Sequence, residues 1–347
     1  MRADVSWSGK LLSRPLALLA MAALCVAGSC AVLYDGNIDV LPPLHLTIVV
    51  HNEEDTGASG GAKLLIPDYN GDQSLLRHFT EAMRAFAGMA ASHGARINFG
   101  SDWTFSEGVA RFDPSFYTDL EAMGHEVDAH AHESHRLYEE VRGEIADAGG
   151  SPTSVASGLN EDEIQERLAY FDRLGGSFRI LWGVALPGHG AGECTAAFVW
   201  RPARGDWTVH DPEGDYIYIG HGELVNGLGA IRRAVAARRG DRVNTCAVFV
   251  SVREFKAAEG APGINDARWT APTDSAFYWE NRVAWWDHFL GEIDEMVAAG
   301  DVVYASLTEV AAAFEAREDE LVFGASAVPR SDAPLRTRNL RAGYPLE

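Results

Sequence analysis

The sequence predicts an α/β fold in which parallel strands alternate with helices. Residues 46–50 form an apolar run rich in β-branched side chains, which suits a buried strand. A helical pattern at 75–90, a strand at 95–99, a short helix and a third strand ending at His130 follow. This alternation implies parallel pairing, so polar residues that follow the strands gather at one edge of the sheet.

Later segments continue the alternation. Residues 160–163 resemble a capping box that opens a helix, and Ser306 with Glu309 caps the closing helix. The Asp113-Pro114 pair begins the short helix before the third strand. Further elements are expected as strands at 178–184, 243–252 and 302–305 and as a helix at 283–297.

Length and composition bound the domain organisation. The 347 residues are 47% hydrophobic, enough for one large domain or two small ones. We expect a signal peptide or membrane anchor at 1–30, a catalytic domain at 31–325 with an elaborated loop region at 185–225, and a C-terminal tail at 326–347.

The N-terminus predicts export. Arg2, Lys10 and Arg14 precede an apolar run at 16–24, the pattern of a secretory signal. A lipid anchor on Cys30 and an uncleaved membrane helix are the alternatives. The protein is therefore expected in the periplasm or outside the cell, where Cys194 and Cys246 could pair.

The net charge is −21. A chain this acidic repels phosphate backbones and anionic lipid surfaces, so nucleic acid is excluded as a partner. Any membrane attachment is expected through the N-terminus alone. The sequence leaves the oligomeric state open.

Residues 124–135 hold four of the twelve histidines. Neutral imidazole is a common ligand of divalent metals, and in an extended chain His130 and His132 project to the same face. A catalytic metal site needs about three protein ligands, often with a carboxylate among them. The sequence His-Asn-Glu-Glu-Asp at 51–55 offers those carboxylates after the first strand.

These motifs resemble the NodB-homology polysaccharide deacetylases, metal-dependent carbohydrate esterases built on an irregular (β/α) barrel. The resemblance covers residues 45–135, with a weaker echo at 243–314, and rests on Gly-His-Glu-Val at 124–127 and on His130. It implies a barrel of about seven parallel strands. Ser134 stands where the family has its second histidine ligand, so that ligand becomes His132 or His135.

The resemblance also implies roles for the acids. The family's acid pair falls on Asn52-Glu53 or on Glu54-Asp55, and only the second keeps two carboxylates. Glu54 would then be the base, and Asp55 or Glu53 the acidic ligand of a divalent metal, with zinc expected and cobalt or nickel as alternatives.

Two further catalytic residues come from looser matches. Residues 200–205 echo an arginine loop of the family, which makes Arg201 the residue that orients the base. The family's late histidine, a general acid, is replaced by Arg253, and His210 or His221 would substitute for it.

The function predicted is hydrolysis of an N- or O-linked acetyl group on a glycan. Two alternatives stand beside it. One is a catalytically inactive carbohydrate-binding or assembly protein, which Asn52 and Arg253 favour. The other is a metal-independent glycosidase that uses two acids of the 53–55 cluster. Such an enzyme needs two catalytic carboxyl groups about 5–10 Å apart, and adjacent side chains rarely lie that way around one glycosidic bond.

Overall fold

The computed structural model describes residues 41–52, 69–131, 136–159, 164–183, 196–222, 225, 227–258 and 278–323. The chain divides into two compact units, Met1–Leu41 and Pro42–Glu347, and the fold described here is that of the second unit. Its strands are β1 (Leu44–Asn52), β2 (Ile97–Ser101), β3 (Glu126–His130), β4 (Val155–Ser157), β5 (Ile180–Leu181), β6 (Val199–Trp200), β7 (Ile217–Ile219), β8 (Asn244–Ser251) and β9 (Val302–Tyr304). Its α-helices are α2 (Gln73–Ser92), α3 (Trp103–Phe112), α4 (Phe116–Ala122), α5 (Tyr138–Asp147), α6 (Ile164–Asp172), α7 (Leu228–Ala236), α9 (Trp279–Ala298) and α10 (Leu307–Glu315), with 3-10 turns η2 (Val252–Phe255) and η4 (Glu318–Glu320).

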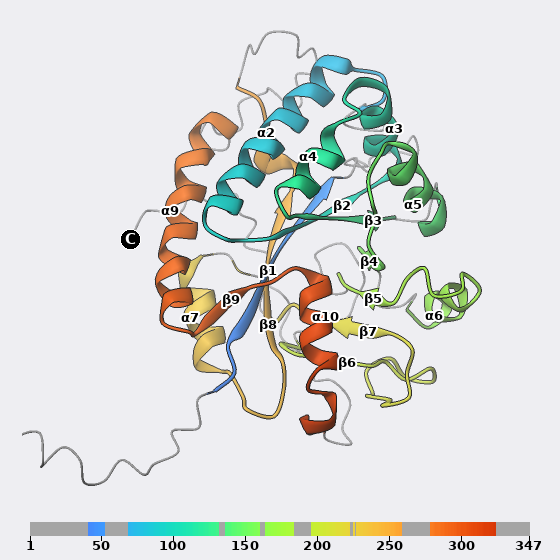
Figure 1. Ribbon diagram of the computed structural model, residues 1–347, viewed down its shortest axis with the longest axis vertical. Helices are drawn as coiled ribbons and strands as arrows, with labels where there is room; N and C mark the ends of the chain where they lie inside the picture. The colour runs from blue at the N-terminus through green and yellow to red at the C-terminus, as the bar shows by residue number, and fades with distance from the viewer. Residues whose placement is uncertain are drawn as a thin grey trace, which may run out of the picture. The chain divides into compact units, whose positions relative to one another are not determined.

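The strands form one nine-stranded sheet (Figure 1). Its order is β6-β7-β5-β4-β3-β2-β1-β8, and β9 pairs with the first residues of β1. Every pairing is parallel except that of β6 with β7. The parallel strands therefore end at one edge of the sheet, which we call the carboxyl end, and begin at the opposite amino end.

Backbone hydrogen bonds nearly close the sheet into a barrel. The Thr245 N–H of β8 donates to the Ala197 carbonyl at 3.0 Å, and the Ala247 N–H donates to the His221 carbonyl at 3.1 Å. Val225 N–H returns a bond to the Ala247 carbonyl at 2.9 Å. The segment that carries β6 and β7 thus reaches the strand at the far edge, and the predicted irregular (β/α) barrel is confirmed.

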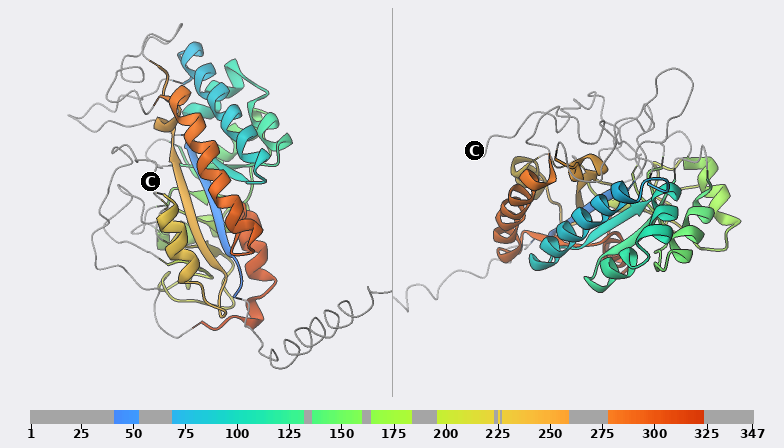
Figure 2. Two further views of the ribbon diagram at one scale, coloured as in Figure 1. Left: turned by 90° about the vertical axis from the view of Figure 1, so that its left-hand side faces the viewer. Right: turned by 90° about the horizontal axis from the view of Figure 1, so that it is seen from above.

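The two faces of the sheet hold separate cores. Leu46, Ile48 and Val50 of β1 join the outer core with the surrounding helices, and α2 and α9 lie side by side there (Figure 2). Val49 points the other way, into an inner core that also contains the apolar face of α10. Because strand side chains alternate, every second residue of a strand lines the barrel interior.

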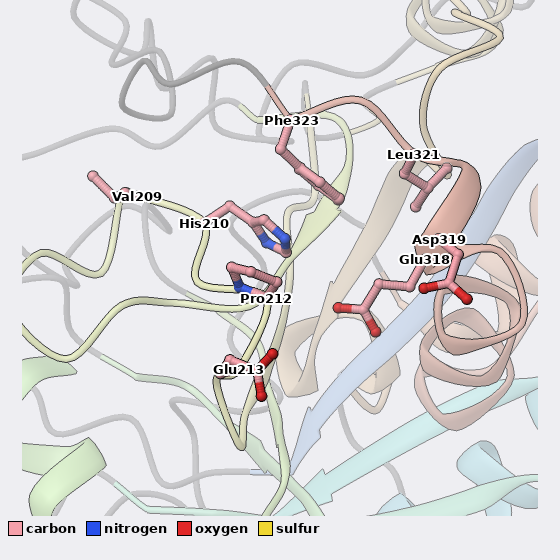
Figure 3. A pocket seen from close by; sticks show the side chains of 8 residues that line it. All are labelled: Val209, His210, Pro212, Glu213, Glu318, Asp319, Leu321 and Phe323. Carbon is pink, nitrogen blue, oxygen red and sulfur yellow. The ribbon is translucent and has the colours of Figure 1, made fainter.

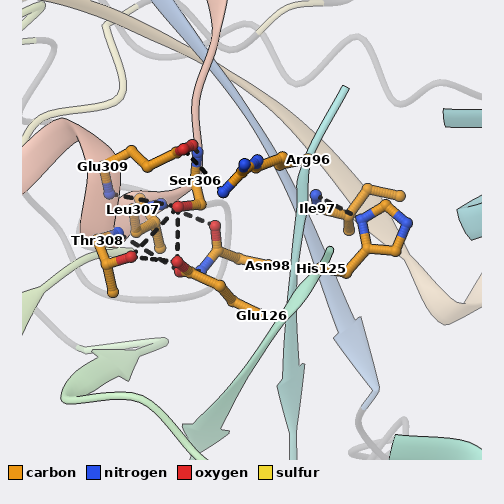
Figure 4. Close-up of polar contacts among 9 residues, drawn as sticks. All are labelled: Arg96, Ile97, Asn98, His125, Glu126, Ser306, Leu307, Thr308 and Glu309. Carbon is orange, nitrogen blue, oxygen red and sulfur yellow. Dashed lines mark hydrogen bonds and ion pairs between the residues drawn. The ribbon is translucent and has the colours of Figure 1, made fainter. Parts of the chain in front are cut away.

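The amino end of the barrel is filled by the start of α10 (Figure 4). Ser306 Oγ donates to the Glu126 carboxylate at 2.6 Å, and the Leu307 N–H donates to Asn98 Oδ1 at 2.8 Å. Asn98 Nδ2 bonds Glu126 at 2.8 Å and Asp128 at 2.7 Å. Burial, with the Glu126 charge nearby, raises the pKa of Asp128 to about 8. Asn98, Glu126 and Ser306 thus form one hydrogen-bonded cluster at this end.

The sequence predicted most of the elements but missed several short strands and helices. The predicted strands and helices match β1, α2, β2, α4, β3, α6, β8, α9, β9 and α10, and the Ser306 capping box is present. The Asp113-Pro114 pair does not begin α4, because Asp113 follows the end of α3 and Ser115 precedes the first residue of α4. The capping box expected at 160–163 lies outside the described residues. The segment 178–184 contains a strand of only two residues, and the three-residue β4 before it was not predicted. Helices α3, α5 and α7 were also missed. The sheet has more than the seven strands expected, because such short strands leave no periodicity to detect.

Several expectations fall outside the described residues, namely the segments 1–30 and 326–347 and the residue Cys194. Cys246 is buried in the outer core, at 1% exposure. Among the helices that the structure describes, none is long and apolar enough to span a bilayer.

Candidate active site

Two histidines meet inside the barrel at its carboxyl end. His51 is the penultimate residue of β1 and His130 is the last residue of β3. Both are fully buried, and their ring centroids lie 3.9 Å apart at a 36° angle. Strand β2 runs between β1 and β3 and places Gly100 here, where a Cβ would lie 3.1 Å from the His51 ring. The missing side chain lets the two imidazoles touch.

The turn after β4 fits closely around His130. Gly158 has a φ of +78°, and a Cβ there would come 2.1 Å from His130 Cε1. A larger residue would therefore be both strained and in collision with the imidazole. The backbone of this turn fixes the position of the His130 ring.

Aromatic side chains from the neighbouring strands complete the wall. Trp182, just after β5, meets His51 edge-on with centroids 5.6 Å apart, and Phe249 of β8 does so at 4.9 Å. The Trp182 ring also meets that of His221, which follows β7, with centroids 6.1 Å apart. His221 is 2% exposed, and its Nδ1 lies 2.8 Å from the Gly222 carbonyl. The carboxyl end therefore gathers three histidines around one indole.

Asn52 faces the other side of the sheet from His51, as strand alternation requires. Its Nδ2 donates to Ser101 Oγ at 3.2 Å, and its carbonyl accepts the Asp102 N–H at 3.1 Å. Asp102 then caps α3 by accepting the Phe105 N–H at 2.9 Å. In the described contacts Asn52 joins the ends of β1 and β2.

Of the predicted metal ligands, the described residues include His130 alone. Glu53, Glu54, Asp55, His132 and His135 lie outside them. Within the described ranges no group of three His, Cys, Asp or Glu side chains could hold a metal ion. The structure thus places His130 next to His51, and a metal site here stays a prediction.

Arg201 and His210 lie at the opposite end of the barrel. Strand β6 runs antiparallel to β7, so Arg201 leaves β6 beside the start of β7. Its guanidinium forms a two-bond ion pair with Glu318, at 2.6 and 2.8 Å. His210 Nδ1 accepts the Arg201 backbone N–H at 3.1 Å, and its ring stacks on Phe323 at 3.6 Å. The structure therefore does not bring these two predicted catalytic residues to His130.

His210 instead lines a separate cavity of about 550 Å³ between the 209–213 loop and the segment after α10 (Figure 3). Burial lowers the pKa of His210, although the Glu318 charge opposes this. The Arg201–Glu318 ion pair joins the end of β6 to η4, so Arg201 stabilises the amino end of the barrel.

Sequence reasoning missed His51 and Trp182. His51 stood within the noted 51–55 cluster, but the acids beside it were the apparent ligands. His51 shares the inward face of β1 with Val49, but the sequence of a strand buried on both faces does not show which side that is. Trp182 carried no signal, because a tryptophan in an apolar run is usually core.

No protein-family model and no curated protein sequence matches the chain. Solved structures do. A protein assigned as a glycoside hydrolase/deacetylase from Parabacteroides distasonis aligns with a TM-score of 0.52 and 10% identity, over 81% of this chain and 74% of that one.

Two others align less closely. A protein assigned as a polysaccharide deacetylase from Pseudomonas aeruginosa has a TM-score of 0.44 and 10% identity, over 79% of this chain and 91% of that one. A 4-α-glucanotransferase from Thermococcus litoralis has a TM-score of 0.48 and 11% identity, over 78% of this chain and 40% of that one. The sheet topology and the Parabacteroides structure together establish the fold, an irregular (β/α) barrel.

Proposed function

We propose that this protein is a divalent-metal-dependent hydrolase that removes N- or O-linked acetyl groups from a glycan. The observation that carries the proposal is the buried His51–His130 pair at the carboxyl end of the barrel. Fold alone does not decide function, but barrels of parallel strands place their active sites at this end. The deacetylase resemblance of residues 124–130 supports the same chemistry.

The residues fit a metal such as zinc, cobalt or nickel. Imidazole nitrogens suit these ions, and His51 and His130 lie close enough to belong to one site. The remaining ligands would come from Glu53 or Asp55 after β1 and from His132 or His135 after β3. When bound, such an ion polarises the acyl carbonyl and lowers the pKa of water.

The chain supplies the proton transfers. Glu54 takes a proton from water as the water oxygen bonds to the acyl carbon and the carbonyl π electrons move onto oxygen. When this oxyanion collapses, the C–N or C–O bond breaks, and the leaving atom takes the proton back from Glu54. The products are acetate and the free amine or hydroxyl of the glycan.

Acetate release from full-length protein tests the proposal. We would supply N-acetylated chitin oligosaccharides and O-acetylated xylan before and after chelation. The expected result is acetate release that chelation abolishes and Zn²⁺, Co²⁺ or Ni²⁺ restores. Release that survives chelation would contradict metal dependence. Glycan binding without acetate release, in protein reconstituted with each metal, would favour the carbohydrate-binding alternative.

A further inference from the structure

The Trp182 indole holds a buried donor. The side chain is fully buried, and its Nε1–H has no hydrogen-bond partner within the described residues. Leaving a buried donor unsatisfied costs about 1–3 kcal/mol, and native proteins seldom do so. An indole N–H can only donate, and it neither titrates nor binds metal. Trp182 thus presents a buried donor for which the described residues supply no acceptor.

The backbone holds Trp182 in place. Its N–H donates to the Ala156 carbonyl at 3.1 Å, and its carbonyl accepts the Leu159 N–H at 3.5 Å. Gly183 follows with a φ of +109°, and a Cβ there would lie 2.6 Å from the Gly158 nitrogen. The same tight turn packs against His130. The indole is thus fixed relative to the histidine pair.

A second buried indole shows why position matters. Trp286 Nε1–H also lacks a partner in the described part of the chain, but Trp286 packs against Phe86 and Phe289 in the outer core. An unsatisfied indole alone does not indicate a ligand. Trp182 differs because its ring touches His51, inside the candidate active site.

We propose that Trp182 Nε1–H donates a hydrogen bond to the carbonyl oxygen of the acyl group that is hydrolysed. This inference rests on the proposed function. Negative charge develops on that oxygen as water adds, and a fixed donor stabilises the charge. The rings of Trp182 and Phe249 pack against His51 and form an apolar wall, in which the indole N–H is the hydrogen-bond donor. An acetyl group, with one acceptor and one methyl, matches such a wall better than a sugar ring with several hydroxyls.

The test compares Trp182→Phe with Trp286→Phe, since each removes one buried, unpartnered indole N–H. Removing one such donor typically lowers kcat about 100-fold, so Trp182→Phe should do so with KM little changed. Trp286→Phe should keep the wild-type kcat. Urea unfolding shows whether the two variants lose similar stability. Equal kcat in the two variants, or a raised KM with unchanged kcat in Trp182→Phe, would overturn the assignment.

Indole NMR separates this inference from the proposed function, because it needs no turnover. The Trp182 N–H resonance is identified by its absence in Trp182→Phe, and acetate serves as the probe. Acetate should move this resonance downfield, saturably, and leave that of Trp286 in place. A shift in protein that hydrolyses no acetylated glycan would support the donor and refute the proposed function. No shift in an active deacetylase would overturn the donor alone.

Discussion

The two ends of the barrel are both polar and buried, yet they are built differently. At the amino end, Asn98, Glu126 and Ser306 satisfy one another through hydrogen bonds. At the carboxyl end, His51 and Trp182 meet through ring edges, and the indole N–H finds no acceptor within the described chain. Hydrogen bonds between protein groups stabilise the fold at the amino end, whereas the indole N–H at the carboxyl end remains available to a ligand. Substitutions at the two ends should therefore separate stability from activity.

We expect the largest difference in activity between variants of two buried histidines, His130 and His125. His130→Ala should lower kcat/KM by about a thousandfold or more, because it removes a proposed metal ligand. His125 is also buried, but its Nδ1 accepts the Ile97 N–H at 3.1 Å and its Nε2 lies 2.9 Å from the Ala87 carbonyl. His125→Ala should cost about 2–3 kcal/mol of unfolding free energy with activity retained.

Acetate-release kinetics and urea unfolding of both histidine variants provide the measurement. Loss of turnover in folded His125→Ala protein, with turnover retained in His130→Ala, would contradict the assignment of the active site to the carboxyl end.

A methyl group at Gly158 should have the next largest effect. Gly158→Ala would push the His130 ring aside, so we expect about a 100-fold loss of kcat/KM. Gly94 is the control, since it has a similar φ of +72° and nothing within 4 Å of an added Cβ. Gly94→Ala should cost only about 1–2 kcal/mol of stability, for the left-handed backbone. Equal activities in the two variants would show that the turn does not position His130.

Asp128 should make stability depend on pH, because burial raises its pKa from 3.8 to about 8. Below pH 3.8 the carboxyl is protonated in both folded and unfolded chains. As pH rises from about 4 to 8, only the unfolded chain releases this proton, so stability falls by up to about 1.4 kcal/mol per pH unit. Urea unfolding across this range should show a flatter profile for Asp128→Asn. An unchanged slope in that variant would rule out Asp128 as the cause.

The smallest effect is expected at the helix cap that fills the amino end. Ser306→Ala removes the cap of α10 and its bond to Glu126, and should cost about 1–2 kcal/mol. Thermal unfolding measures this loss, and kcat per folded molecule should match the wild type. A large fall in kcat would mean that the amino end also serves catalysis.

The sequence predicted the parts of the site that lie on long elements. His130 was found because a histidine-rich segment follows a clear strand. His51 was not chosen over its acidic neighbours, because β1 is buried on both faces and an apolar run does not reveal which side faces inward. The prediction for Arg201 rested on the resemblance of residues 200–205 to a family loop, and a two-residue strand gives no sign that β6 runs antiparallel to β7. Which side of β1 faces inward and which way β6 runs both depend on pairing between distant strands, and a single sequence does not reveal that pairing.

Cobalt binding by the metal-free, full-length protein, followed by visible absorption, tests most directly whether His51 and His130 hold a metal. Wild-type protein should bind about one Co²⁺ per chain and develop d–d bands with histidine coordination. His51→Ala and His130→Ala should each lose these bands while remaining folded. Undiminished cobalt binding and unchanged bands in both variants would contradict a metal site built on this histidine pair.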